Sequence, residues 1–188
     1  MTQRTEGAAI RFDATLSAIG GSAVVRLPET ASKELPSRGQ VAVHGTINGY
    51  ELRTVLEPDG YGGHWMQVDS VLQKVLGISA GDKATLELAV TKEWPEPEVP
   101  EDFAQALSMA PQRVREKWND ITPMARWEWI RWVNETRNPD TRAVRIEKTV
   151  SKLNGEHRRP CCFNLAACTD PVLSKSGKLM DAAPVIPG

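Results

Sequence analysis

Two adjacent cysteines are the residues whose types and spacing most directly suggest chemistry in this chain. Cys161 and Cys162 follow Arg158-Arg159-Pro160, and Cys168 is the third cysteine of the 188 residues. A thiol beside two guanidinium groups has a lowered pKa and can act as a nucleophile or a redox sensor. An odd count with two neighbouring thiols is not a disulfide framework, so we expect reduced thiols in a cytoplasmic protein.

The same two thiols also have a metal-binding and a structural interpretation. They lack the CxxC spacing with which two sulfurs face one ion, and His157 is the nearest imidazole. The sequence therefore predicts no metal and no cofactor. Cysteine is also a small hydrophobe, so Pro160-Cys161-Cys162-Phe163 is compatible with a short buried strand. No Cys-His-Asp triad is evident, and both the structural interpretation and the reactive-thiol hypothesis stay open.

The cysteines follow a locally basic segment. Residues 122–160 carry 9 Lys/Arg and 5 Asp/Glu, whereas the whole chain has a net charge of -1. Guanidinium groups bind carboxylates and phosphates with two hydrogen bonds, so these arginines are compatible with an anion-accepting pocket. Neighbouring tryptophans would supply its aromatic floor. The candidate ligand-binding residues are Arg126, Trp129, Trp132, Arg142, Arg145, Arg158 and Arg159.

Both features have a structural alternative. Glu128, Glu135 and Glu147 are available to pair with the arginines. The segment from Pro123 to about Thr136 is too apolar for a single buried stripe, and tryptophans at this density are typical of a packed core. A central core helix is therefore the alternative to an aromatic platform.

Proline punctuation organises the second half of the chain. Residues 94–100 contain three prolines, which exclude a helix or a central strand and predict a stiff linker. Beyond it, proline occurs repeatedly at expected helix starts, where its missing N–H costs nothing. The four starts are marked by Pro100, Pro111, Pro123 and Pro139. We expect a four-helix unit over residues 101–164, followed by a flexible or surface-draped extension over 165–188.

The first half reads as strands. Residues 10–16 alternate between apolar and polar side chains, and Asn48-Gly49 between two apolar runs predicts a hairpin. A pattern of strand, short helix, glycine turn and strand occurs twice, over residues 24–43 and 65–88. Two such copies on one chain could form a barrel with no exposed edge strand.

The turn Leu76-Gly77-Ile78-Ser79-Ala80-Gly81-Asp82 resembles that of AbrB/MazE-type swapped-hairpin barrels. The expected fold class is therefore α+β: a pseudo-twofold AbrB-like β-barrel over residues 1–93, then the helical unit. The likeness raises DNA binding, but residues 1–93 carry 9 Lys/Arg and 11 Asp/Glu, which disfavours phosphate contacts. His44 and His64 are isolated in sequence and are expected to be strand or loop histidines.

The helical half contains a series of specific motifs: Pro100-Glu101-Asp102-Phe103, Thr122-Pro123-Met124-Ala125-Arg126, Trp129-Ile130-Arg131-Trp132, Thr141-Arg142 and Arg158-Arg159-Pro160-Cys161-Cys162-Phe163. Through these motifs it resembles the YdeI/OmpD-associated family, labelled bacteriocin-protection. The barrel resembles the uncharacterised domain commonly fused ahead of it. The resemblance implies a barrel followed by helices and a protective role, with no established reaction.

These observations lead to three functional hypotheses. The first is a non-enzymatic binding or protection protein that holds a small molecule or a peptide in a cleft between barrel and helices. The second is a cysteine-dependent enzyme or redox sensor that uses Cys161 or Cys162. The third is an AbrB-like DNA-binding protein, which the charge balance disfavours. No run approaches the ~18 apolar residues of a membrane span.

Overall fold

A computed structural model describes residues 7–161 and 164–181 of the chain. The chain divides into two compact units. The first contains the chain up to Pro95, Leu165–Cys168 and the chain from Val172. The second contains Glu96–Asn164 and Thr169–Pro171.

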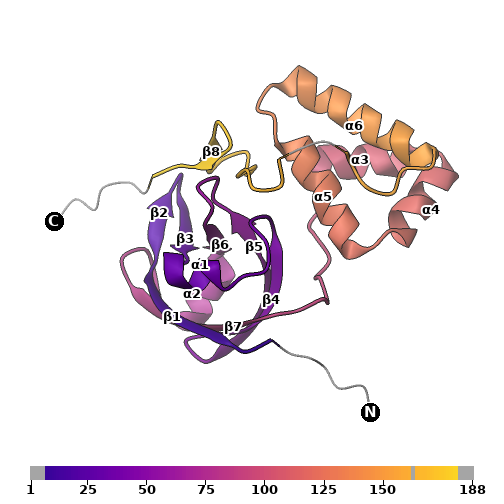
Figure 1. Cartoon of the computed structure of the whole chain (residues 1–188). Coiled ribbons are helices and arrows are strands. Elements are labelled where there is room, and N and C mark those ends of the chain that lie inside the picture. Colours follow the sequence, from indigo (N-terminus) through magenta and orange to yellow (C-terminus); the bar gives the residue numbers. More distant parts are fainter. Residues whose placement is uncertain (1–6, 162–163, 182–188) are drawn as a thin grey trace, which may run out of the picture. The chain divides into compact units, whose positions relative to one another are not determined.

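The first unit is a curled antiparallel sheet of seven strands in the order β1-β7-β4-β5-β6-β3-β2 (Figure 1). Two short helices, α1 (Glu29–Lys33) and α2 (Ser70–Leu76), accompany it. The α+β class is therefore confirmed. The strands are β1 (Ile10–Thr15), β2 (Ser17–Ile19), β3 (Ser22–Arg26), β4 (Val41–Ile47), β5 (Tyr50–Pro58), β6 (His64–Val68) and β7 (Lys83–Val90).

The expected repeat of strand, short helix and strand is present. It consists of β3-α1-β4 and β6-α2-β7, and the corresponding strands pair antiparallel with each other, β3 with β6 and β4 with β7. The strands that precede the two copies, β1 and β2 for the first and β5 for the second, also pair in equivalent ways. β1 pairs with β7 and β2 with β3, while the start of β5 pairs with β4 and its end with β6.

Apolar and polar side chains alternate along strands such as β1, so that one face of the sheet forms a hydrophobic core. In β1, Ile10 and Phe12 are buried, whereas Arg11 and Asp13 between them are exposed. The predicted hairpin at Asn48-Gly49 joins β4 to β5, and both residues adopt the positive φ that this turn requires. The interior is filled mainly by branched aliphatic residues, among them Val25, Val43, Ile47, Leu56, Leu86 and Leu88.

The segment expected to be a flexible or surface-draped extension contributes to the core of the first unit. It forms a hairpin of β8 (Ser174–Lys175) and β9 (Lys178–Leu179). The Leu179 amide donates to the carbonyl oxygen of Asp59 at 2.9 Å. Its apolar side chains complete a second buried cluster, which contains Ile19, Val24, Trp65, Cys168, Leu173 and Leu179.

The described part of the second unit contains four helices: α3 (Glu101–Met109), α4 (Gln112–Asp120), α5 (Pro123–Asn134) and α6 (Pro139–Asn154). Each begins at or directly after a proline that marks a predicted start. Side chains cap two of them, since Thr122 accepts a hydrogen bond from the Ala125 amide and Asn138 accepts from the Asp140 amide. These local signals explain why the helix starts are readable in the sequence.

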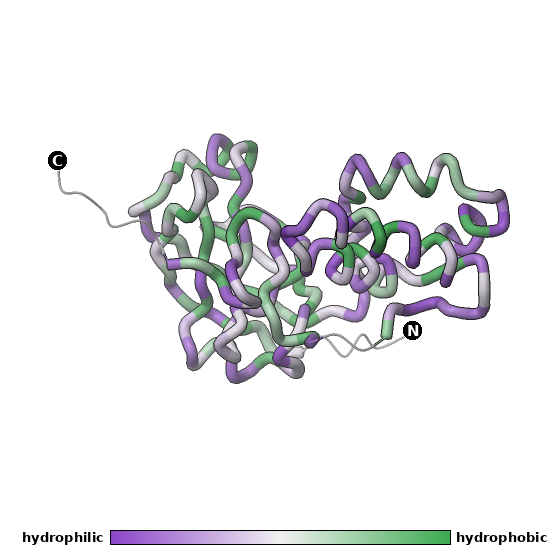
Figure 2. The backbone as a smooth tube through the Cα atoms, turned by 90° about the horizontal axis from the view of Figure 1, so that it is seen from above, coloured by the Kyte–Doolittle hydropathy of each residue, from purple (hydrophilic) through white to green (hydrophobic). Residues whose placement is uncertain are grey.

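The helices pack through apolar stripes. Hydrophilic and hydrophobic residues alternate along them (Figure 2). The buried stripes include Phe103, Leu107, Val114, Trp118, Trp129, Val133, Ile146 and Leu153. Within the described residues, none of the helices combines the length and hydropathy needed to cross a lipid bilayer.

Candidate functional site

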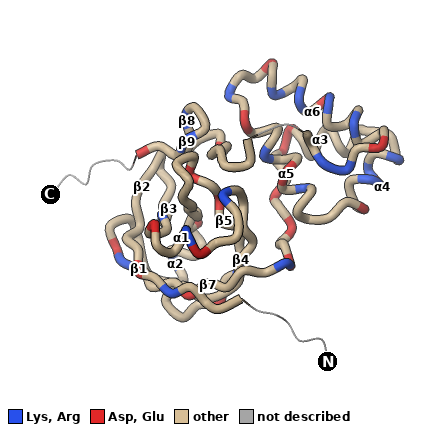
Figure 3. Tube along the Cα trace, in the orientation of Figure 1, with Lys and Arg blue, Asp and Glu red and all other residues tan. Residues whose placement is uncertain are grey.

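The five candidate arginines lie in the second unit, and each forms an ion pair with a carboxylate of that unit. Figure 3 shows acidic residues in the segment that leads to α3 and basic residues along α6. The pairs are Arg126–Glu96, Arg142–Asp102, Arg145–Glu135, Arg158–Asp120 and Arg159–Glu128. This geometry agrees with the interpretation in which the arginines of the basic segment pair with carboxylates of the same unit.

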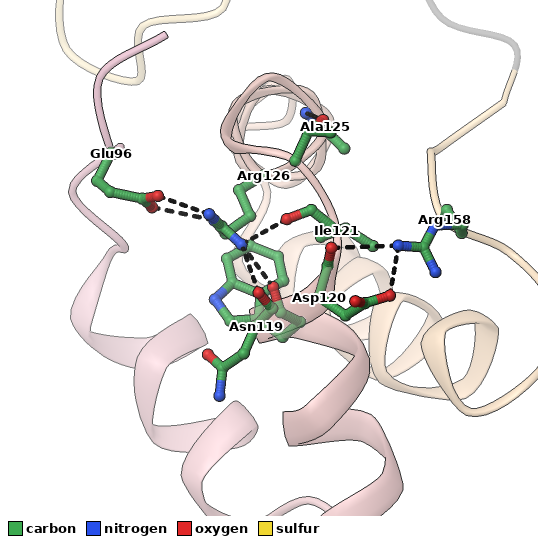
Figure 4. A network of polar contacts seen from close by, with 9 residues as sticks. Glu96, Asn119, Asp120, Ile121, Ala125, Arg126 and Arg158 are labelled. Carbon is green, nitrogen blue, oxygen red and sulfur yellow. Dashed lines mark hydrogen bonds and ion pairs between the residues drawn. The ribbon is translucent and has the colours of Figure 1, made fainter. Parts of the chain in front are cut away.

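Arg126 has the most extensive set of bonds (Figure 4). Its Nε and Nη2 donate to the two carboxylate oxygens of Glu96 at 3.0 and 2.6 Å. Its Nη1 donates to the carbonyl oxygens of Trp118 and Ile121 at 2.8 and 2.6 Å. These carbonyls belong to the end of α4, which has no further helical donors. Arg126 therefore joins the segment before α3 to the C-terminus of α4.

Arg158 and Trp129 are connected through the backbone. The Trp129 Nε1–H donates to the carbonyl oxygen of Arg158 at 3.0 Å, and the Trp129 side chain is fully buried. The Arg158 Nη2 donates to a carboxylate oxygen of Asp120 at 2.6 Å (Figure 4). Trp129 is therefore a core residue whose polar group is satisfied inside the unit.

Trp132 already has cations of this chain against its ring. The guanidinium of Arg145 lies 5.2 Å and the ammonium of Lys152 5.5 Å from the ring centroid. Arg145 also donates to the Trp132 carbonyl oxygen at 2.6 Å and to Glu135 at 2.8 Å. This half-buried tryptophan is thus part of a packed cation–π arrangement.

Arg159 and Arg142 hold their carboxylates with two hydrogen bonds each. Arg159 pairs with Glu128, a carboxylate only 7% exposed, and this hydrogen bonding raises the pKa of Arg159. Arg142 donates to the two oxygens of Asp102 at 2.6 and 2.9 Å. These bonds lower the pKa of Asp102, because they stabilise its charged form.

The cysteine candidates have different environments. Cys161 is exposed. Cys162 and Phe163 lie outside the described residues. Cys168 is buried and is not part of a disulfide. Among the residues that the structure describes, no group of three His, Cys, Asp or Glu side chains could hold a metal ion.

His64 is part of a buried polar cluster that its sequence context does not reveal. Its Nε2 lies 3.0 Å from the carbonyl oxygen of Gly39, and its Nδ1 lies 2.6 Å from the Oγ of Ser32. Because a carbonyl only accepts, Nε2 carries the proton and Nδ1 accepts from Ser32. Burial lowers the pKa of this histidine. Ser32 is 32 residues away in the chain, so no local spacing indicates the contact.

Two surface hollows were also not evident from the sequence. One of about 280 Å³ lies within the second unit and is lined by Val99, Ala104, Leu107, Arg115 and Trp118 among others. The other, of about 580 Å³, lies on the first unit against β4, β5 and β7. The apolar residues of α3, which recur on one face of the helix, were the sequence feature that could have indicated the first hollow. The second depends on strand register, which composition does not indicate.

Comparison with protein families assigns both halves of the chain. Residues 12–88 match the model described as a domain of unknown function, DUF1905. Residues 96–155 match the model OmdA, described as bacteriocin-protection, YdeI or OmpD-associated, and this segment ends before the Cys-Cys motif. No curated protein shows a significant match to the chain. The first half of the chain is therefore similar to DUF1905 and the second half to the bacteriocin-protection, YdeI or OmpD-associated family, as the resemblance in the sequence predicted.

Proposed function

We propose that this chain is a non-enzymatic protection protein that binds cationic, apolar peptides on its second unit. The family description supports a protective role. The observation that carries the site is the hollow of about 280 Å³ between α3 and α4. The proposal places the peptide within the second unit alone.

The hollow has an apolar floor. Leu107 and Trp118 are nearly buried core residues whose remaining surface lines it, together with Val99 from the segment before α3. Grooves of this kind accept the apolar face of an amphipathic helix. Ala104, which is exposed on α3, leaves the hollow open because its side chain is short.

Two carboxylates of the segment that enters α3 favour a cationic partner. Residues 94–121 carry 6 Asp/Glu, of which Glu96, Asp102 and Asp120 pair with arginines outside this segment. Glu98 and Glu101 are exposed in the segment that enters α3. Opposite charges at the rim of an interface steer association and select the partner.

The paired arginines argue against the anionic ligand that the basic segment suggested. An anion would have to displace a carboxylate from a guanidinium that already has both hydrogen bonds, as in Arg126–Glu96 and Arg142–Asp102. Such charge-assisted bidentate pairs are among the stronger hydrogen bonds in proteins. No observation on the described residues favours the cysteine-dependent enzyme or the DNA-binding alternative.

The test is titration of the full chain with a synthetic amphipathic peptide of lysine and leucine, followed by calorimetry. Ala104→Arg fills the hollow with a bulky cation and should weaken binding at least tenfold, which corresponds to about 1.4 kcal/mol. Gln105→Arg adds the same charge at the next exposed position of α3 and should leave the affinity within about twofold.

The non-enzymatic part of the proposal has its own measurement. After prolonged incubation with the protein, mass spectrometry should find the peptide intact. Equal affinities for the Ala104→Arg and Gln105→Arg variants would contradict the site, and a cleaved or modified peptide would contradict the non-enzymatic role.

A further inference from the structure

The hollow of about 580 Å³ on the first unit lies on the solvent-facing side of three neighbouring strands. It is distinct from the peptide site proposed above and uses none of its residues. Glu51 and Arg53 come from β5, His44 and Thr46 from β4, and Glu87 and Ala89 from β7.

Strand register arranges these side chains in two rows. His44 lies directly opposite Arg53 on β5 and Ala89 on β7. Thr46 lies directly opposite Glu51 on β5 and Glu87 on β7. Residues directly opposite one another project from the same face, so one row presents a guanidinium and an imidazole. The other row presents two carboxylates beside a hydroxyl.

The spacing of the rows selects a ligand by length. Residues two apart on a strand are separated by about 6.6–6.8 Å along it. An extended chain advances about 3.3–3.6 Å per residue, so the ammonium and carboxylate of a dipeptide lie about 7 Å apart. A free amino acid is about half that long. A dipeptide therefore reaches from one row to the other.

The charged groups of the hollow are available for exchange with a ligand. Arg53 pairs with Glu93 at 3.2 Å and Glu87 with Arg11 at 2.7 Å, and all four side chains are about half exposed or more. Such surface pairs are weak, in contrast to the bidentate arginine pairs of the second unit. The side chain of Ala89 is short, which leaves space above the sheet at the base of the hollow.

We propose that this hollow binds a dipeptide through its two charged termini. The carboxylate lies at Arg53 and His44, and the ammonium lies between Glu51 and Glu87. The backbone of the ligand lies over β4 between His44 and Thr46, beside Ala89, and its side chains point to solvent, so the site recognises termini rather than side chains.

The experiment is a titration of the full chain with L-alanyl-L-alanine, followed by NMR chemical shifts and calorimetry at low salt. N-acetylation or C-terminal amidation of the dipeptide should each weaken binding at least tenfold. Free L-alanine should bind at least tenfold more weakly than the dipeptide. No binding of the dipeptide at millimolar concentration, or equal binding of its blocked forms, would overturn the proposal.

Two variants and two controls locate the site. Arg53→Gln removes the cationic end and Ala89→Leu fills the floor, and each should reduce affinity at least tenfold. Lys83→Gln removes an exposed cation of β7 that does not line the hollow and should leave affinity unchanged. Equal loss in Arg53→Gln and Lys83→Gln would show a general charge effect and contradict the site. Ala104→Arg, on the second unit, should not alter dipeptide binding.

Discussion

Arg142 and Asp102, 40 residues apart in the chain, form a two-hydrogen-bond ion pair that joins α6 to the first turn of α3. The Arg142 Nε and Nη2 lie 2.6 and 2.9 Å from the two oxygens of Asp102. The remaining guanidinium nitrogen donates to the side chain of Asn134 at 2.7 Å. The guanidinium of Arg142, one of the candidate ligand-binding residues, thus makes its hydrogen bonds inside its own unit.

This pair predicts a structural effect of Arg142→Ala. The variant should lower the free energy of unfolding by about 1–2 kcal/mol, because it loses charge-assisted hydrogen bonds while Asp102 keeps access to water. Exposed Arg137→Ala serves as the matched control and should change it by less than about 0.5 kcal/mol. Urea denaturation measures both, and an equal effect of the two substitutions would contradict the role of the pair.

His64 predicts a loss of stability on mild acidification. Its folded pKa lies below the ordinary value because burial disfavours the imidazolium; Arg38 lowers it further, whereas Asp59 raises it. The stabilisation is therefore complete above the unfolded pKa of about 6.5 and is lost as pH falls through the folded pKa. The slope for one proton is at most about 1.4 kcal/mol per pH unit.

Denaturation of the wild type between pH 7.5 and 5 measures this slope. The variant His64→Gln should show a shallower dependence, because the group that takes up the proton is gone. Exposed His157→Gln, by contrast, should retain the slope of the wild type. A steep slope that survives in His64→Gln would assign the acid sensitivity to another group.

In the segment directly before the C-terminal hairpin, substitutions at two neighbouring residues should have different effects. Leu173 is 1% exposed in the cluster with Trp65, whereas Val172 is 62% exposed. Leu173→Ala should cost about 2–4 kcal/mol of unfolding free energy, since it creates a cavity. Val172→Ala should cost less than about 0.5 kcal/mol. Similar melting temperatures for the two variants would show that the hairpin does not support the first unit.

Gly45 predicts a backbone conflict within the sheet. A Cβ at this position would lie 1.8 Å from the carbonyl oxygen of Glu87 on β7, so β4 and β7 would have to separate. Gly45→Ala should destabilise the first unit by at least about 1–3 kcal/mol, as overpacking does. Gly7→Ala meets nothing within 4 Å and is the control. Thermal denaturation followed by circular dichroism compares them, and a wild-type melting temperature for Gly45→Ala would refute the close strand approach.

Much of the local architecture was predictable because its causes are local. Pro123 with Thr122, and Pro139 with Asn138, start helices through missing N–H groups and side-chain caps, which need no distant partner. Asn48-Gly49 determines a hairpin by the φ angles that it tolerates. The repeat of strand, short helix and strand was also readable from local sequence patterns. The family matches confirm that the helical half resembles the YdeI/OmpD-associated family and that the first half resembles an uncharacterised domain.

Only the tertiary structure decided what the charged and C-terminal residues do. An arginine has the same charge whether it binds a ligand or a carboxylate, and Asp102 is brought to Arg142 by the packing of α3 against α6. Ser32 reaches His64 only when the chain brings α1 beside β6. The hairpin of residues 174–179 looks polar in sequence, but its one apolar side chain, that of Leu179, is buried with Leu173 and Trp65. Such contacts join residues far apart in the chain, so their partners are selected by the folded core rather than by local spacing.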